Sequence, residues 1–361
     1  MLLMAINISL AMCLSIIVFS VVRNISKNRI DLNGHSLLMK SSTDSLRGFS
    51  IIMIVFAHIC QYEVRLKQIL IGGGVSYKFI FSWGAIGVCL FFFLSGFGCY
   101  LSLNKGDKNI GKWLLQHVGK MLTHFVFAFV LIIAFMLIVF KNELSITAIL
   151  MNLVTLRLPG STVWYFKIQI FFYLILALSM TINKKRSWII VVLVSLGYAV
   201  VAKYGLNLQD FWWKTALCFP AGCMVAHYYD ILPKYTDRLW FRVLALFLGG
   251  LSYLLLLKDG HYRIYVQLPA YVIIAFTISM LWGWLVKENR LYIEVGKASL
   301  DLYLIHIGVV EGVFLMDMSL NMKIVFFIIL SAVFTVVNYC LSEKVYGSAL
   351  HIQHTNRIQR N

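Results

Sequence analysis

Apolar runs close to the length that crosses a bilayer recur along the whole chain, and they constrain its fold more than any other feature. A spanning helix needs about 20 mainly apolar residues. Hydrophobic residues make up 60% of the 361 residues, and charged residues make up only 13%. No soluble core of this size needs so much apolar surface. Because backbone polar groups in lipid must be bonded within their own segment, the runs predict helices. The sequence therefore predicts an all-α fold, a polytopic transmembrane helical bundle.

We expect about eleven spanning helices, ten in one core and one extra at the amino terminus. The extra helix and a basic loop take up residues 1–43, the core takes 44–342, and a short polar tail takes 343–361. The first run lacks the basic start and the cleavage site of a signal peptide. The predicted helices cover residues 1–22, 47–66, 79–103, 121–140, 163–182, 188–203, 212–229, 240–257, 264–286, 299–317 and 323–342.

The net charge of +17 does not indicate nucleic-acid binding. The basic residues lie in short loops between apolar runs and form no continuous basic domain. One alternating set of loops carries twice as many Lys and Arg residues as the other set. Cytoplasmic loops carry this excess in membrane proteins, so the amino terminus is predicted outside and the carboxyl terminus in the cytoplasm. We expect anionic lipid headgroups as neighbours and no nucleic-acid partner.

The seven cysteines fall mainly inside apolar runs, their count is odd, and their spacing is not typical of zinc ligands. We interpret them as small buried hydrophobic residues and expect neither a metal site nor a disulfide. Cys218 and Cys223 flank Pro220, which indicates a kinked helix rather than a ligand pair.

One segment, DSLRGFSIIMIVFAHIC (residues 44–60), places a basic residue and a histidine at the two ends of an apolar run. Arg47 and His58 are eleven residues apart, which on a helix is about 16 Å and three turns plus roughly 20°. Both side chains are therefore predicted on one face, with Asp44 as the N-cap. Arg47 would lie at the cytoplasmic surface and His58 about half-way through the bilayer. An ionisable residue at that depth indicates a functional site, although an interfacial anchor and a polar contact between helices are the simpler alternative.

The chemistry of this pair suits a long ligand with an anionic head and a reactive tail, which is the shape of a coenzyme A thioester. An arginine fork binds phosphates in a bidentate way. A histidine can take a proton from a hydroxyl near neutral pH.

Four blocks of the chain, in order, resemble the acyltransferase-3 family of bacterial integral-membrane O-acyltransferases. They are LRGFSIIMIVFAH, FFFLSGFGCYL (Phe91 to Leu101), WYFKIQIFFYL (from Trp164) and VGKASLDLYLIHIGV (Val295 to Val309). The resemblance covers roughly residues 44–342. It implies transfer of an acyl group, usually acetyl, from cytoplasmic acyl-CoA to a hydroxyl of a cell-envelope or exported carbohydrate. It also implies that His58 is the essential histidine and Arg47 its basic partner.

Two departures from the family pattern are present. Members often carry an Arg-x-x-Arg pair after the second helix, and His117 and Lys120 take the closest positions here. They are the candidate donor-binding cations, although Lys lacks the arginine fork. The family also usually opens close to its Arg–His helix, whereas this chain has the extra amino-terminal span.

Further residues are candidates for lining the site. Ser95 follows three phenylalanines and precedes Gly96, a pattern that favours close helix packing over a nucleophile. His306 and Glu311 lie near the middle of one helix but about 140° apart, so they are predicted to face different neighbours. Tyr303 belongs to the Tyr-Leu-x-His block and Trp164 opens the tryptophan block.

The sequence therefore predicts a membrane O-acyltransferase in a bacterial inner membrane, with acetyl-CoA as donor substrate and no permanently bound cofactor. His58 is the predicted general base and Arg47 positions the donor, while a covalent acyl-histidine relay is an alternative mechanism. A transporter or flippase of a lipid-linked sugar is the alternative function. No two-fold repeat or paired broken helices of the transporter kind are apparent in the sequence.

Overall fold

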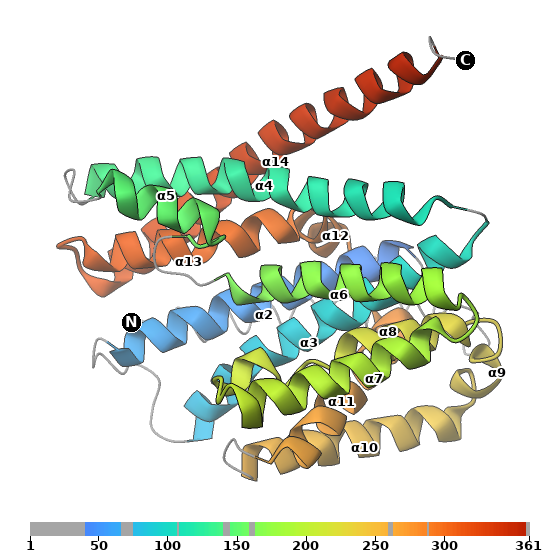
Figure 1. The fold of residues 1–361 in the computed structure, drawn as a ribbon. Helices are drawn as coiled ribbons and strands as arrows, with labels where there is room; N and C mark the ends of the chain where they lie inside the picture. The colour runs from blue at the N-terminus through green and yellow to red at the C-terminus, as the bar shows by residue number, and fades with distance from the viewer. Residues whose placement is uncertain are drawn as a thin grey trace. The chain divides into compact units, whose positions relative to one another are not determined.

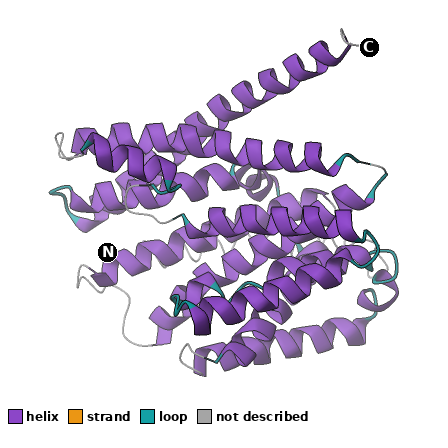
Figure 2. Cartoon of the chain, viewed as in Figure 1, coloured by secondary structure: helices purple, strands orange, loops and turns teal. Residues whose placement is uncertain are grey.

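The computed structural model describes residues 40–65, 75–106, 108–139, 145–158, 163–258, 263–286 and 289–358. Within these ranges the chain is built from helices joined by turns, with no β-strand (Figure 2). Eight of the described helices are long and apolar enough to cross a membrane, or nine if the consecutive helices α12 (Arg290–Lys297) and α13 (Ser299–Leu315) count as one span. The all-α, multi-pass membrane fold is confirmed, while the count of eleven spans is not. The predicted helix 1–22 lies outside the described residues.

The chain divides into two compact units, one of residues 1–110 and 174–297, the other of residues 111–173 and 298–361. The helices that make up these units are labelled in Figure 1. Helix α6 (Trp164–Ile182) contributes its first half to unit 2 and its second half to unit 1. The other helices of unit 1 are α2 (Lys40–Arg65), α3 (Val75–Asn104), α7 (Ser187–Val200), α8 (Cys218–His227), α9 (Pro233–Thr236), α10 (Leu239–Lys258), α11 (Ile264–Leu285) and α12 (Arg290–Lys297). Unit 2 holds α4 (Ile110–Val139), α5 (Ile146–Val154), α13 (Ser299–Leu315) and α14 (Leu320–Ile358).

Helix α3 is the most deeply buried long helix of unit 1 and packs against α2, α8 and α11. Two glycines set its distance from α8. A Cβ on Gly96 would overlap the backbone of Phe219, and a Cβ on Gly222 would overlap the backbone of Phe93. The predicted close packing around Gly96 is thus confirmed, because neither helix has a side chain between the two backbones.

The predicted helix 212–229 is not continuous. A short 3₁₀ turn ends at Trp212, turns follow, and α8 starts only at Cys218 and runs for ten residues. Pro220 lies in the first turn of α8, where its missing N–H costs no helical bond. The predicted kink at Pro220 within a longer helix is therefore wrong. Ten residues are too few to cross a bilayer as one helix.

In unit 2, α13 packs against α4 and α14. A Cβ on Gly308 would crowd Ile132, and a Cβ on Gly312 would crowd Phe135, so these glycines allow α13 and α4 to approach closely. Helix α14 continues through the predicted polar tail as far as Ile358.

Candidate active site

Helix α2 carries both residues of the Arg–His pair and is held in place by backbone contact with α12. A Cβ on Gly48 would overlap the carbonyl oxygen of Tyr292, and a Cβ on Gly296 would overlap that of Asp44. Trp282 of α11 donates its indole N–H to Ser45 Oγ at 3.2 Å. These contacts fix the rotation of α2 about its own axis, and with it the directions of its polar side chains.

Asp44 is not the N-cap of this helix, because α2 already begins at Lys40. The preceding turn is helical since Ser42, Thr43 and Ser45 are buried, and tertiary packing outweighs their weak helix propensity. Asp44 instead accepts a hydrogen bond at 3.2 Å from Arg47 Nη1, one turn along the helix.

The guanidinium of Arg47 lies beside α3. Its side chain is 34% exposed, and its Nη2 is 3.9 Å from the position of a Cβ on Gly98. Gly98 belongs to the FFFLSGFGCYL block, so two of the sequence blocks meet at this arginine. A larger residue at Gly98 would approach the guanidinium.

His58 lies three turns further along α2, which is one unbroken helix between the two residues. Its ring is half-buried, while Ile54 and Ala57 on the same helix are almost completely buried. Nδ1 of His58 lies 3.0 Å from Oε1 of Gln61. An amide oxygen can only accept, so Nδ1 carries the proton and Nε2 is the basic nitrogen of the ring.

The Arg47 and His58 side chains can therefore perform two separate tasks about 16 Å apart along one helix. A guanidinium with a single carboxylate contact retains N–H donors for an anion. A neutral imidazole held through Nδ1 can accept a proton at Nε2. Ser95, on α3 of the same unit, is half-buried.

The two candidate donor-binding cations of unit 2 both have protein partners. The ring of His117 stacks on Trp113 with 4.1 Å between ring centroids, and its Nδ1 donates to the Trp113 carbonyl oxygen at 2.8 Å. The ammonium of Lys120 pairs with Glu343 of α14. His117 thus lies against the rings of Trp113 and Tyr173, and the charge of Lys120 is neutralised by a carboxylate.

The predicted lining residues on α13 are packed to different degrees. His306 is fully buried and its Nδ1 donates to the Leu302 carbonyl oxygen at 2.9 Å. Tyr303 is also buried, with its ring 5.9 Å from that of His306 and 5.1 Å from that of Tyr165. Glu311 is half-buried.

Trp164 is the first residue of α6, with its ring against that of Tyr165. The predicted site residues are thus divided between the two units. Arg47, His58 and Ser95 belong to unit 1, and His117, Lys120, Trp164, Tyr303, His306 and Glu311 belong to unit 2.

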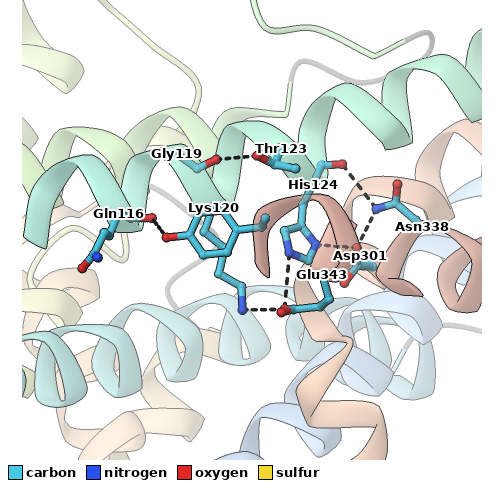
Figure 3. A network of polar contacts seen from close by, with 9 residues as sticks. Gln116, Gly119, Lys120, Thr123, His124, Asp301, Asn338 and Glu343 are labelled. Carbon is cyan, nitrogen blue, oxygen red and sulfur yellow. Dashed lines mark hydrogen bonds and ion pairs between the residues drawn. The ribbon is translucent and has the colours of Figure 1, made fainter. Parts of the chain in front are cut away.

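Unit 2 contains a polar network that the sequence analysis missed (Figure 3). Nδ1 of His124 lies 2.7 Å from Oδ1 of Asp301, and Asn338 Nδ2 donates to the same oxygen at 2.5 Å. Asn338 also donates to the carbonyl oxygen of His124 at 3.3 Å. On the other side of the ring, His124 Nε2 is 3.6 Å from Oε1 of Glu343, which links the network to Lys120.

This network joins three helices by side chains that are almost fully buried. His124 lies on α4, Asp301 on α13 and Asn338 on α14, and each is at most 2% exposed. The signal that could have found them is a polar or ionisable residue inside an apolar span, the same signal that singled out His58.

A multi-pass helical membrane protein with an arginine and a histidine on one continuous helix is the class that the fold and these residues define. The family model of the acyltransferase domain, that of the acyltransferase-3 family, matches residues 41–343. The chain therefore belongs to this family and is a membrane acyltransferase. Comparison with curated proteins and with solved structures gave no match.

Proposed function

We propose that this membrane acyltransferase transfers an acetyl group from cytoplasmic acetyl-CoA to a hydroxyl of a cell-envelope or exported carbohydrate in a bacterial inner membrane. The observation that carries the proposal is the hydrogen bond from His58 Nδ1 to Gln61 Oε1 at 3.0 Å. It places the ring proton on Nδ1, so that Nε2 is the basic nitrogen of this half-buried imidazole, three turns from a guanidinium on the same helix.

In the proposed reaction, Nε2 of His58 accepts the proton of the acceptor hydroxyl as its oxygen attacks the thioester carbonyl carbon. The new C–O ester bond forms and the C–S bond breaks. The proton then passes from His58 to the departing thiolate, so the histidine returns neutral and no net proton is released. Gln61 holds the reacting tautomer throughout.

Arg47 is proposed to bind the diphosphate of the donor. Asp44 occupies one edge of its guanidinium, and the remaining N–H groups can form charge-assisted hydrogen bonds with phosphate oxygens. Orientation of two substrates in one site accounts for much of the rate of such reactions.

The test is transfer of radiolabel from acetyl-CoA into alkali-labile ester of envelope carbohydrate, using membranes that contain the protein. Wild type, His58→Ala and Arg47→Ala are compared at matched expression. Label transfer by wild type, abolished in His58→Ala and recovered at high donor concentration in Arg47→Ala, supports the proposal and both roles.

Unchanged transfer in His58→Ala would remove this histidine from the chemistry. Membranes that translocate a lipid-linked sugar without consuming acetyl-CoA would support a transporter instead.

A further inference from the structure

We infer that a basic cavity at one end of unit 1, lined by Lys108 and Lys184, binds the phosphate-bearing nucleotide end of the acyl-CoA donor. This inference rests on the proposed function and names the residues that recognise its donor. The cavity has a volume of about 310 Å³, which falls at the lower end of the range of roughly 300–1,000 Å³ for small-molecule sites.

The lining combines two cations with an apolar floor. It consists of Leu103, Lys108, Asn109, Ile110, Met180 and Lys184. Leu103 and Met180 are almost fully buried, so they form the floor, and both lysines are exposed at the rim. An apolar surface accommodates a purine ring, and the ammonium groups suit the phosphates attached to its ribose.

Both lysines are oriented by neutral oxygens. Lys108 Nζ donates to Ser102 Oγ at 3.1 Å, and Lys184 Nζ donates to the Gly106 carbonyl oxygen at 3.1 Å. An ammonium has three N–H donors, so each retains two for an anion. Among the described residues, neither ammonium is paired with a carboxylate.

Lys108 and Lys184 differ in this respect from Lys120, which takes a position of the family's Arg-x-x-Arg pair. The charge of Lys120 is neutralised by Glu343. A phosphate at Lys120 would have to displace a carboxylate, whereas a phosphate at Lys108 and Lys184 would add to bonds already present.

The position of the cavity relative to Arg47 fits the order of groups in coenzyme A. Leu103, in the cavity, is five residues along α3 from Gly98, which lies against the Arg47 guanidinium. That separation is about 7.5 Å of helix, and His58 is about 16 Å from Arg47 in the other direction along α2. The nucleotide, the diphosphate and the thioester of one donor can thus meet the cavity, Arg47 and His58 in turn.

An anionic lipid headgroup presents the same phosphate chemistry, and the experiment has to separate the two sources. The purified full-length protein is placed in nanodiscs of zwitterionic lipid, and its affinity for radiolabelled coenzyme A is measured. Dephospho-coenzyme A, which lacks the 3′-phosphate, is the second probe. The variants are Lys108→Gln, Lys184→Gln and the double variant, and Lys185→Gln is the matched control because it removes an adjacent exposed charge outside the cavity.

We expect each cavity variant to weaken coenzyme A binding by about tenfold, as for loss of one charge-assisted hydrogen bond, and Lys185→Gln to leave it within about twofold. Wild type should bind dephospho-coenzyme A more weakly than coenzyme A, and the double variant should no longer distinguish them. Unfolding midpoints equal to that of wild type exclude misfolding of these exposed-site variants.

Coenzyme A binding that is equal in wild type and the double variant would overturn the inference and leave the proposed function standing. The same holds if the variants lose only retained anionic lipid, measured by native mass spectrometry, since the cavity would then hold a headgroup. Failure of wild type to bind coenzyme A at all would instead remove the proposed function.

Discussion

Nδ1 of His124 lies 2.7 Å from Oδ1 of Asp301, and both side chains are at most 2% exposed among apolar helices. Asn338 shares the same carboxylate oxygen. A buried ion or hydrogen-bonded charge contributes little net stability compared with an apolar core, but removing one partner leaves the other unsatisfied at high cost. The relationship therefore makes α4, α13 and α14 depend on one another.

Asp301→Ala is expected to lower the free energy of unfolding by about 3–5 kcal/mol, because it leaves His124 Nδ1–H and the Asn338 amide without their acceptor. Denaturant unfolding in mild detergent measures this loss. The control is Glu294→Ala, which removes a carboxylate paired with Lys297. The Glu294 side chain is 59% exposed and that of Lys297 is 47% exposed. This variant should change the free energy of unfolding by less than about 1 kcal/mol. Equal effects of the two variants would mean that the network does not hold unit 2 together.

The spacing of residues within one helix was sufficient to predict how the two candidate residues on α2 are arranged. Eleven residues between Arg47 and His58 define their relation on any continuous helix, and α2 is continuous. The His124–Asp301–Asn338 network joins residues 177 and 37 positions apart. Its assembly depends on which helices pack together, and hydropathy alone does not contain that information.

Helix ends were predicted less well than helix interiors. An apolar run indicates which residues avoid water, but it does not indicate at which residue the helix ends. The mostly apolar run 212–229 was predicted as one helix, yet α8 begins only at Cys218. Within α8, Gly222 packs against the α3 backbone near Gly96. Tertiary contact decides such an end, as it also extends α2 back to Lys40.

Gly48→Ala is expected to destabilise unit 1 and to reduce acyl transfer, because the new methyl group would overlap the Tyr292 carbonyl oxygen and displace α2. Overpacking of this kind costs typically about 1–3 kcal/mol. Gly250→Ala is the matched control, since nothing lies within 4 Å of its Cβ position on α10, and it should be neutral or stabilising by up to about 1 kcal/mol. Thermal unfolding and label transfer are measured on both, and an unaffected Gly48→Ala would contradict the packing of α2 on α12.

Gln61→Leu tests whether the tautomer of His58 matters. Loss of the amide acceptor should lower kcat by about tenfold or more without raising KM for the donor, and by less than the roughly 10²–10⁴-fold expected for loss of the base itself in His58→Ala. Gln61→Glu retains an acceptor oxygen and should recover much of kcat. A kcat unchanged in Gln61→Leu would show that the hydrogen bond does not prepare His58 for reaction.

Arg47→Lys separates charge from geometry at the donor-binding end of α2. In wild type, Asp44 occupies one edge of the Arg47 guanidinium, and the rest of the planar fork can bind two phosphate oxygens. Lysine keeps the positive charge but lacks this fork. KM for acetyl-CoA should rise by about tenfold with kcat nearly constant, since one charge-assisted hydrogen bond is lost. Arg47→Gln should raise KM further, and a donor that ends at pantetheine, without phosphates, should be used equally by wild type and both variants. If instead the variants impair the pantetheine donor as strongly as acetyl-CoA, Arg47 acts on His58 or on the helix and does not bind the phosphates.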